Sequence, residues 1–346
     1  MKKLLFLLLP FTGFAQIPAY YDGIDFKVSK DDLRADLSDL VTATHTKQLV
    51  YTPGVWETLL QADLDPTDDS KVLLIYGYDD NLEDKFHRTR DKNKRNTGCS
   101  AGNCTGLWER EHVFPKSLAI PVLDTDKPGT GTDAHNLRAV DRQMNSSRSN
   151  KPFTEGNGNA KTVNSNFYPG DEWIGDVARI LMYMYIRYET QCNANAVVKG
   201  STNIADVNMP DLLLKWNAID PPSEYEIVRN EVISLQQGNR NPFIDNPYLA
   251  TLTWGGTEAQ NNWIELSNIN YTQEDINIEV FPNPTSDIVN IEAKSFKSAK
   301  LYTIEGIILQ SDLKNKFSIS QYPAGIYILT IQLENGKIVT KKIVKK

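Results

Sequence analysis

The sequence predicts an α+β protein in which a mixed N-terminal domain is followed by a small all-β sandwich. Residues 176–188 place apolar side chains at helical spacing along one face. Residues 71–76 form a short apolar run between polar turns, which is typical of a strand. After about residue 275, short β-rich runs alternate with turn signals, and this spacing indicates a sandwich. The 346 residues, 40% of them hydrophobic, are enough for two such domains.

The first 15 residues have the pattern of a signal peptide. Lys2 and Lys3 precede an apolar stretch, and Ala15 is a small residue suited to cleavage before Gln16. A buried N-terminal strand or helix is the alternative. No later apolar run reaches the roughly 18 residues that a bilayer requires. We therefore expect a secreted chain with no stable membrane span.

Residues 16–260 have the pattern of one domain with mixed helices and strands, and we expect this domain to be the catalytic one. Turn-rich loops are expected over 81–106 and 124–132, and Gly238 is expected to cap the end of a helix. A polar linker over 261–274 then leads to the β-domain over 275–346. The expected strands are 71–76 and 111–114, and the expected helices are 33–44, 137–148, 176–188 and 222–236.

The three cysteines suit a chain that leaves the cytoplasm. Cys99 and Cys104 bracket a short Ser-Ala-Gly-Asn loop and can form a disulfide in an oxidising compartment, which leaves Cys192 over. A zinc site at the same pair is the weaker interpretation, because no second Cys/His pair has a suitable spacing.

Of the four histidines, His112 has the neighbours that hydrolytic chemistry needs. It follows Glu111 in the run Trp-Glu-Arg-Glu-His-Val-Phe-Pro, at the expected end of a strand. An imidazole there can take a proton from water while the carboxylate holds a hard cation. Because strand side chains alternate between faces, a bend near Pro115 is needed to bring both into one site. A surface Glu-His pair without function is the alternative.

Further downstream, Asn145 and Arg148 lie one turn apart on one face of an expected helix. The Asn145 amide offers an oxygen to the same cation, and Arg148 can neutralise a phosphate oxygen. Asn150 is expected to tie down a turn. Mg²⁺ is the first choice for these oxygen ligands, with Ca²⁺ or Mn²⁺ as alternatives.

Four motifs together resemble the bacterial endonuclease I family of secreted nucleases, which carry a ββα-metal, or His-Me finger, site. They occur in the family's order at residues 109–117, 133–137, 145–150 and 238–243, and the resemblance spans roughly residues 30–250. It implies cleavage of DNA, and often of RNA, with little sequence preference and with 5′-phosphate ends.

The resemblance also implies roles for individual residues. His112 would be the general base and Arg148 a second catalytic residue, with Glu111 and Asn145 as metal ligands. The supporting residues would be Asp133, His135 and Asn136, together with Asn150. One departure is Gly131, where some members have an acidic residue.

The formal net charge of -7 counts against a protein that binds nucleic acid. Local basic stretches can still contact phosphate when the overall field repels it. The expected nucleic-acid contacts are therefore Arg88, Arg90, Lys94 and Arg138. Solvated loops are the alternative for the run over 85–95.

Residues 275–346 resemble the C-terminal sorting domain of the type IX secretion system. The resemblance rests on Pro282-Asn283-Pro284, the segment 323–327 and the terminal lysines. It implies the type IX machinery as a partner and a location outside the cell or on its surface. A carbohydrate-binding or adhesion module is the alternative. For the whole chain we expect a monomeric, secreted nuclease, with a catalytically silent adhesin or nucleic-acid-binding protein on the same fold as the alternative.

Overall fold

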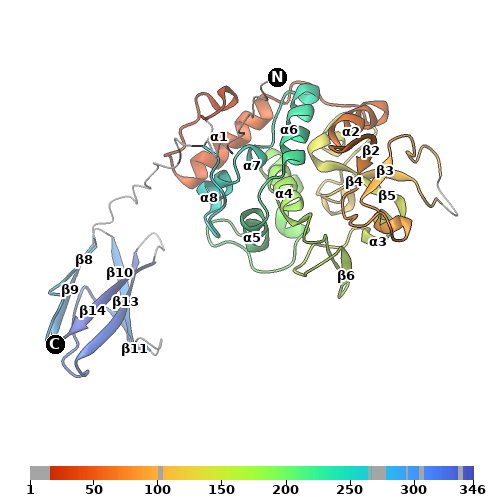
Figure 1. The fold of residues 1–346 in the computed structure, drawn as a ribbon. Coiled ribbons are helices and arrows are strands. Elements are labelled where there is room, and N and C mark those ends of the chain that lie inside the picture. Colours follow the sequence, from red (N-terminus) through yellow and green to blue (C-terminus); the bar gives the residue numbers. More distant parts are fainter. Residues whose placement is uncertain are drawn as a thin grey trace, which may run out of the picture. The chain divides into compact units, whose positions relative to one another are not determined.

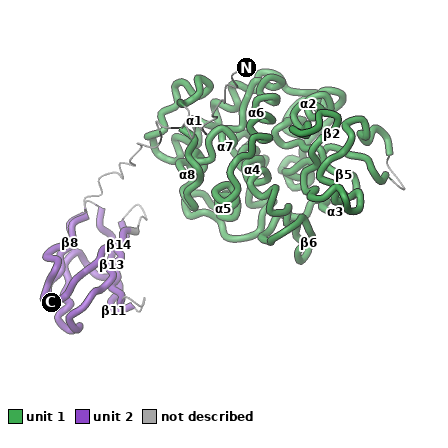
Figure 2. The backbone as a smooth tube through the Cα atoms, viewed as in Figure 1, with its two compact units in different colours: residues 1–268 green, residues 269–346 purple. Residues whose placement is uncertain are grey.

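The protein divides into two compact units, residues 1–268 and residues 269–346 (Figure 2). The computed structural model describes residues 16–99, 104–263, 266, 278–293, 295–303, 308–333 and 338–346. The expected signal peptide and most of the expected linker lie outside these described residues. Within them, no helix has both the length and the apolar composition to cross a bilayer.

Helices dominate the N-terminal unit, and α4 lies in its middle (Figure 1). The α4 helix is buried from Ile174 to Ile186 and packs against α1, α5 and α7. It is the amphipathic helix predicted over 176–188, but burial extends around its whole circumference because helices cover it on several sides. The helices are α1 (Lys30–Ala43), α2 (Trp56–Ala62), α3 (Arg142–Arg148), α4 (Ile174–Tyr188), α5 (Asp211–Ile219), α6 (Glu224–Gln237), α7 (Pro242–Asp245) and α8 (Tyr248–Trp254).

Helix ends follow local sequence signals. Helix α6, predicted over 222–236, begins with a capping box in which Ser223 and Glu226 satisfy each other's backbone N–H groups. It ends at Gly238, whose φ of 97° is left-handed, as predicted for a glycine cap. A Cβ at Gly238 would also lie 2.4 Å from the Thr44 carbonyl oxygen. Conformation and space therefore both require glycine here.

In its described residues, the N-terminal unit also contains three small antiparallel sheets, with strand orders β1-β2-β3, β4-β5 and β6-β7. Buried side chains of α2, β2, β4 and β5 share one apolar core that includes Trp56, Val72 and Trp108. The strands are β1 (Leu64–Asp65), β2 (Asp68–Leu73), β3 (Thr89–Asp91), β4 (Trp108–His112), β5 (Leu137–Asp141), β6 (Lys161–Val163) and β7 (Asn166–Tyr168).

The predicted helix over 137–148 is wrong in its first half. Residues Leu137–Asp141 form strand β5, and α3 begins only at Arg142, where Asp141 accepts hydrogen bonds from Gln143 N (2.7 Å) and Met144 N (2.9 Å). All five β5 residues are buried, so burial does not alternate along the strand, and its sequence Leu-Arg-Ala-Val-Asp lacks a strict alternation of polar and apolar residues. Without that alternation, a short buried strand cannot be distinguished from a helix.

The stretch predicted as a loop over 81–106 also contains regular structure. Strand β3 pairs with β2 through Val72↔Arg90, and a short 3-10 helix covers Asp84–Phe86. A disulfide joins Cys99 and Cys104, whose Cα atoms are 5.9 Å apart, and Cys192 is a buried free thiol.

The C-terminal unit is all-β, as predicted. One sheet has the order β11-β10-β13-β14 and the other β12-β9-β8, and residues of both sheets contribute to one buried apolar cluster. The strands are β8 (Glu279–Phe281), β9 (Ile288–Glu292), β10 (Phe296–Tyr302), β11 (Ile308–Leu313), β12 (Lys316–Ser318), β13 (Gly325–Leu333) and β14 (Ile338–Lys345).

Candidate active site

The predicted catalytic residues meet at the end of strand β4. Strand β4 pairs with β5 through Glu111↔Arg138 and His112↔Leu137, and α3 packs against both strands. A cavity of about 330 Å³ lies where β4 ends. It is lined by Arg110, Glu111, His112, Pro115, Lys116, Ser117, Asn145, Arg148, Ser149 and Asn150. Residues up to 40 positions apart in sequence therefore surround one space.

His112 is held in the orientation and charge state that a base requires. Its Nε2 lies 2.8 Å from the Gly131 carbonyl oxygen, which can only accept, so Nε2 carries the proton and Nδ1 keeps a lone pair. Burial lowers the pKa of His112 to about 4, and nearby Lys116, Arg110 and Arg148 act in the same direction. The imidazole is therefore neutral at neutral pH.

Gly131 owes its identity to close packing. A Cβ at this position would lie 2.0 Å from the Asp124 carbonyl oxygen. Any larger residue would displace the segment whose carbonyl orients His112. An acidic side chain, which some family members have here, would therefore not fit at Gly131 without moving the carbonyl that orients His112.

Glu111 has a buried carboxylate, and among the described residues only one of its two oxygens has hydrogen-bond or ion-pair partners. Tyr76 Oη donates to its Oε1 at 3.0 Å, and Arg148 Nη1 lies 3.3 Å from the same atom. Nothing among the described residues donates to Oε2. Burial raises the pKa of Glu111 to about 7, although Arg148 and Tyr76 oppose the shift. A positive charge in the cavity would restore the ionised form.

Asn145 is oriented by a residue that the sequence analysis did not single out. Its Nδ2 donates to Glu109 Oε1 at 2.7 Å. Because a carboxylate can only accept, this bond fixes which amide atom points away, and Oδ1 accepts no hydrogen bond from the described residues. Glu109 Oε2 is held by Arg142 Nε and Asn96 Nδ2, both at 3.1 Å. The sequence spacing could have identified Glu109, because residues two apart on one strand, such as Glu109 and Glu111, point to the same face.

This donor set suits a hard divalent cation. Two oxygens without hydrogen-bond donors, Glu111 Oε2 and Asn145 Oδ1, belong to side chains that line one cavity, and oxygen is the ligand that Mg²⁺ and Ca²⁺ prefer. The described residues contain no cluster of three or more His, Cys, Asp or Glu side chains able to hold a metal. Water would complete the coordination, and Mg²⁺ usually retains several waters in protein sites.

Arg148 connects α3 to the end of β4. Its guanidinium is 1% exposed and donates to the Val113 carbonyl (2.7 Å) and the His112 carbonyl (3.3 Å), besides its ion pair with Glu111. These contacts position the two neighbouring catalytic candidates. The expected contact of Arg148 with phosphate stays a prediction, whereas Arg110 and Lys116 are further cations on the cavity wall that the sequence analysis missed.

Asn136 holds the turn that follows His112. Its Oδ1 accepts from Phe114 N at 2.7 Å, and its Nδ2 donates to the Phe114 carbonyl at 3.2 Å. Asn150 Nδ2 donates to Ser117 Oγ at 3.2 Å, and both residues line the cavity.

Asp133 and His135 lie in the core behind this turn rather than in the cavity. Asp133 accepts from Tyr183 Oη (2.7 Å) and Tyr188 Oη (2.9 Å). His135 Nε2 is 3.2 Å from the Asn239 carbonyl, and burial lowers its pKa to about 4. Both side chains are fully buried, so their contribution to the site passes through packing and hydrogen bonds.

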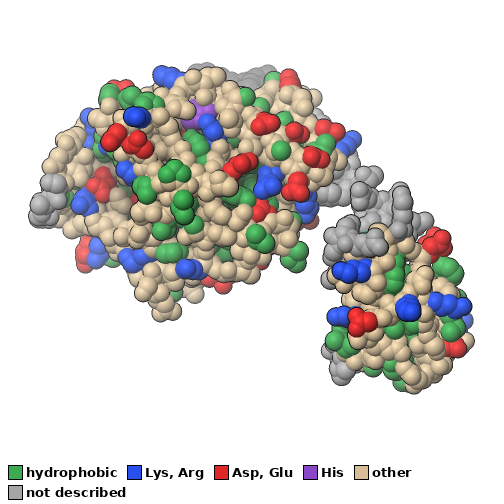
Figure 3. Space-filling view, turned by 180° about the vertical axis from the view of Figure 1, so that it is seen from behind, with side chains coloured by type: hydrophobic (Ala, Val, Ile, Leu, Met, Phe, Trp, Pro, Cys, Tyr) green, Lys and Arg blue, Asp and Glu red, His purple; other side chains and the backbone are tan. Residues whose placement is uncertain are grey.

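Two of the four expected nucleic-acid contacts require correction. Arg138 is 1% exposed and pairs with Asp176 at 2.6 Å, and Arg90 is 6% exposed and pairs with Asp141 at 3.1 Å. Burial and pairing are inconsistent with direct contact to a nucleic acid. The other two are accessible: Arg88 pairs with Glu172, and Lys94 is exposed. Figure 3 shows acidic and basic side chains interspersed on one face of the N-terminal unit.

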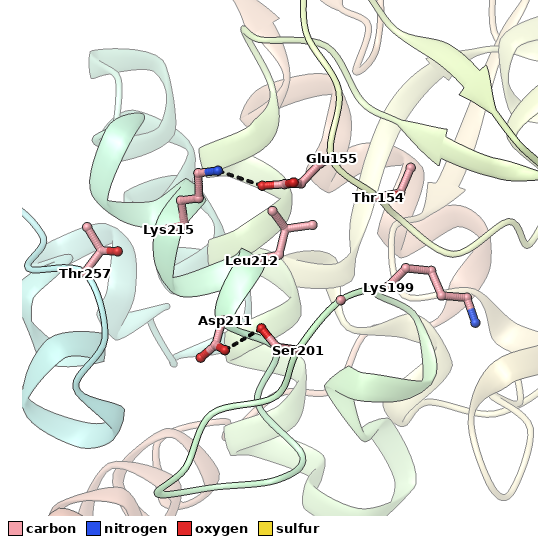
Figure 4. A pocket seen from close by; sticks show the side chains of 9 residues that line it. Thr154, Glu155, Lys199, Ser201, Asp211, Leu212, Lys215 and Thr257 are labelled. Carbon is pink, nitrogen blue, oxygen red and sulfur yellow. Dashed lines mark hydrogen bonds and ion pairs between the residues drawn. The ribbon is translucent and has the colours of Figure 1, made fainter. Parts of the chain in front are cut away.

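A separate cavity of about 410 Å³, between Glu155 and Asp211, lacks comparable chemistry (Figure 4). Its charged side chains include Lys215, which is 2.6 Å from Glu155, and Asp211, which accepts from Ser201 at 2.7 Å. None of its nine lining residues is a histidine or a cysteine. The cavity at His112 is therefore the stronger candidate for catalysis.

Comparisons with known proteins address the same regions of the chain. The sequence profile described as "Endonuclease I" matches residues 29–248, and that described as "Secretion system C-terminal sorting domain" matches residues 279–346. The protein named "Extracellular ribonuclease" in Bacillus subtilis (strain 168) is 35% identical over 273 residues, which cover 73% of this chain and 84% of that protein. One of the same name in Bacillus amyloliquefaciens is 34% identical over 264 residues, or 70% of this chain and 80% of that protein.

Proposed function

Because the chain belongs to the endonuclease I family and is a secreted nuclease, we propose that it is a metal-dependent endonuclease for DNA and RNA. The proposal rests on one observation above the others. A neutral, buried His112 with a fixed Nε2 proton shares a cavity with two oxygens, on Glu111 and Asn145, that receive no hydrogen bond from the described residues. That combination supports the proposal of a general base next to a cation site.

In the proposed reaction, His112 acts on the attacking water. Its Nδ1 takes a proton as the water oxygen bonds to phosphorus, and the bond from phosphorus to the 3′ oxygen breaks. The products are a 5′-phosphate and a 3′ hydroxyl, which gains its proton from solvent. The Gly131 carbonyl stabilises the imidazolium by accepting from Nε2–H throughout. Removal of a general base typically costs about 10²–10⁴-fold in rate.

Glu111 and Asn145 would hold the cation, and Glu109 would keep the Asn145 amide turned toward it. When bound, a divalent cation neutralises charge on the scissile phosphate and on the leaving oxygen. Arg148 holds the Glu111 carboxylate in place, and the cations of Arg110 and Lys116 line the route by which a phosphate would enter. Mg²⁺ is the proposed metal, with Mn²⁺ or Ca²⁺ as substitutes.

Substrate breadth follows from what the cavity contains. Its charged and polar side chains suit a phosphate, which every nucleic acid has, and phosphate contacts carry no sequence information. The ribonucleases among its relatives support RNA as a substrate beside DNA. We therefore propose cleavage with little sequence preference.

The C-terminal unit assigns the location. It is a secretion-system sorting domain, and the chain acts outside the cell or at its surface. The type IX machinery is the proposed export partner, and the N-terminal unit is proposed to act as a monomer.

Plasmid cleavage tests the proposal directly. The wild-type chain should convert supercoiled plasmid and folded RNA to fragments with Mg²⁺, and a chelator should stop both reactions. His112→Ala should lose about 10²–10⁴-fold in rate while it still binds DNA. Wild-type rates from His112→Ala would remove the base assignment, and chelator-resistant cleavage would remove the metal. End-labelling of the products should find phosphate on the 5′ ends.

A further inference from the structure

A cavity of about 550 Å³ lies against the face of α3 that adjoins the one at the catalytic cavity. Asn145 and Arg148 of α3 line the catalytic cavity, whereas Met144 and Ser147 line this one. Residues three apart share a helix face, and neighbouring residues are rotated by about 100°. The two cavities therefore occupy adjacent faces of a single short helix.

The walls of the second cavity combine aromatic rings with lysines. Tyr78 and Phe86 are half-buried, their ring centroids are 5.2 Å apart, and the planes are tilted by 32°. Lys85 Nζ lies 4.5 Å from the centre of the Phe86 ring, and Lys161 from β6 is exposed at the rim. The full lining is Tyr78, Lys85, Phe86, Met144, Ser147, Asn159, Ala160, Lys161, Thr162 and Phe167.

Both lysines remain available to an anion. Lys85 is 3.1 Å from Glu83, whose side chain is 75% exposed, and such a surface pair contributes little. Lys161 donates to the Asn157 amide at 3.3 Å and has no acidic partner among the described residues. The basic run over 85–95 thus places Lys85, rather than the buried Arg90, where a phosphate can approach it.

We propose that this second cavity is a nucleobase subsite for the same strand whose phosphate enters the catalytic cavity, and that it makes the enzyme favour single-stranded over duplex nucleic acid. The proposal rests on the function proposed above. Aromatic rings stack on a base of any sequence, and lysines attract the flanking phosphate. Helix α3 is about 10 Å across, so a strand crossing it needs only a few nucleotides. A base paired within a duplex cannot leave its stack without cost.

The test compares single-stranded with duplex binding. The full chain carrying His112→Ala, which removes the proposed base, is titrated with a fluorescein-labelled oligothymidylate and with a labelled duplex of equal length. Adding Tyr78→Leu, which keeps apolar bulk but removes the ring, should weaken single-strand binding about tenfold and leave duplex binding within about twofold. Tyr78→Phe should leave both unchanged, and Tyr248→Leu on α8, outside this cavity, serves as the control.

An equal loss on both substrates, or no loss on either, would overturn the subsite. If Tyr78→Leu does not fold, Lys161→Gln on the exposed hairpin takes its place. It should reduce the slope of log Kd against log salt by about one for the single strand only. The wild-type chain is also assayed on plasmid and on bis(p-nitrophenyl) phosphate. If the wild-type chain cleaves neither substrate, the proposed function is rejected. If it cleaves them normally and Tyr78→Leu does not change single-strand binding, the subsite alone is rejected.

Discussion

Asn145 can offer its amide oxygen to the cavity only while something accepts from its amide nitrogen. Glu109 accepts at 2.7 Å and is itself fixed by Arg142 and Asn96. The orientation of Asn145, a proposed metal ligand, therefore depends on Glu109, which does not itself line the cavity. The same holds at His112, which is oriented by the carbonyl of Gly131, a residue that also does not line the cavity.

Glu109→Ala should therefore weaken metal binding without unfolding the chain. The Asn145 amide loses its acceptor, and a rotated amide would present its NH₂ group to the cation. We expect Mn²⁺ affinity, measured by isothermal titration calorimetry, to fall about tenfold, within the 10–100-fold effect typical of outer-sphere partners.

Glu109→Gln separates the hydrogen bond from the charge. The glutamine removes the negative charge and keeps one acceptor for Asn145 Nδ2, while its NH₂ group loses the hydrogen bonds that Arg142 Nε and Asn96 Nδ2 donate to Glu109 Oε2. We expect it to bind Mn²⁺ within about threefold of wild type, because orientation and not charge is what Glu109 supplies. A loss in Glu109→Gln as large as in Glu109→Ala would assign its effect to charge instead.

The pH dependence of cleavage should itself depend on the metal concentration. Burial raises the pKa of Glu111 to about 7, so protons compete with the cation below that pH. At limiting Mg²⁺ the rate should fall as pH drops below about 7. At saturating Mg²⁺ the carboxylate stays ionised, and His112, with its pKa lowered to about 4, stays a free base. The rate should then be flat from about pH 5.5 to 8.

Steady-state rates across this range at two Mg²⁺ concentrations provide the measurement. An acid limb centred near pH 6.5 at both concentrations would mean that His112 titrates as an ordinary imidazole. That outcome would contradict the burial-based account of the site.

At the scale of elements, the junction of β4, β5 and α3 carries the site. Asn136 joins the turn after β4 to the start of β5 through two hydrogen bonds to Phe114, and Arg148 joins α3 to the same turn. Both residues are at most 1% exposed. Loss of the Asn136 or the Arg148 side chain would leave buried backbone groups without hydrogen bonds, which lowers the free energy of unfolding.

Asn136→Ala should destabilise the N-terminal unit by about 2 kcal/mol, because the Phe114 N–H would be buried and unpaired. Guanidinium unfolding followed by tryptophan fluorescence measures the change, and Asn195→Ala on the exposed surface is the matched control. If both variants unfold at the wild-type midpoint, the turn does not depend on Asn136.

The sequence predicted this junction only in part. Apolar residues at helical spacing predicted α1, α4 and α6, and the structure confirms these helices. Strand β5 was missed because both of its faces are buried, and its Arg138 and Asp141 look like surface residues in the sequence. Their buried partners, Asp176 and Arg90, are far away in the chain, so no local pattern reveals the pairing.

The site shows the same limit. The residues proposed to carry the chemistry, such as His112 and Glu111, stand in a recognisable motif. Residues that orient them do not: Gly131 acts through a backbone carbonyl, and Tyr76 through a hydroxyl that only the fold brings to Glu111. Contacts between segments distant in sequence, rather than residue types, define those roles.

At the scale of the whole molecule, the two units have separate cores and separate family assignments. Every residue of the proposed site lies in the N-terminal unit. The sorting domain is therefore expected to be dispensable for catalysis and required for export.

A chain that ends at Asn268 should cleave plasmid with the kcat/KM of the full chain, within about twofold, because no site residue is removed. Its unfolding midpoint should also match that of the N-terminal unit in the full chain. In the native host, the shortened chain should remain inside the cell envelope. A large loss of kcat/KM would show that the C-terminal unit contributes to substrate binding.

The position of a bound metal tests the central claim most directly. Crystals of the chain soaked in Mn²⁺ give an anomalous scattering peak that locates the ion. We predict one peak in the cavity at the end of β4, in direct contact with a Glu111 carboxylate oxygen and with Asn145 Oδ1, and with water at its other positions. A peak elsewhere, or an Asn145 amide that turns its nitrogen toward the ion, would contradict the account.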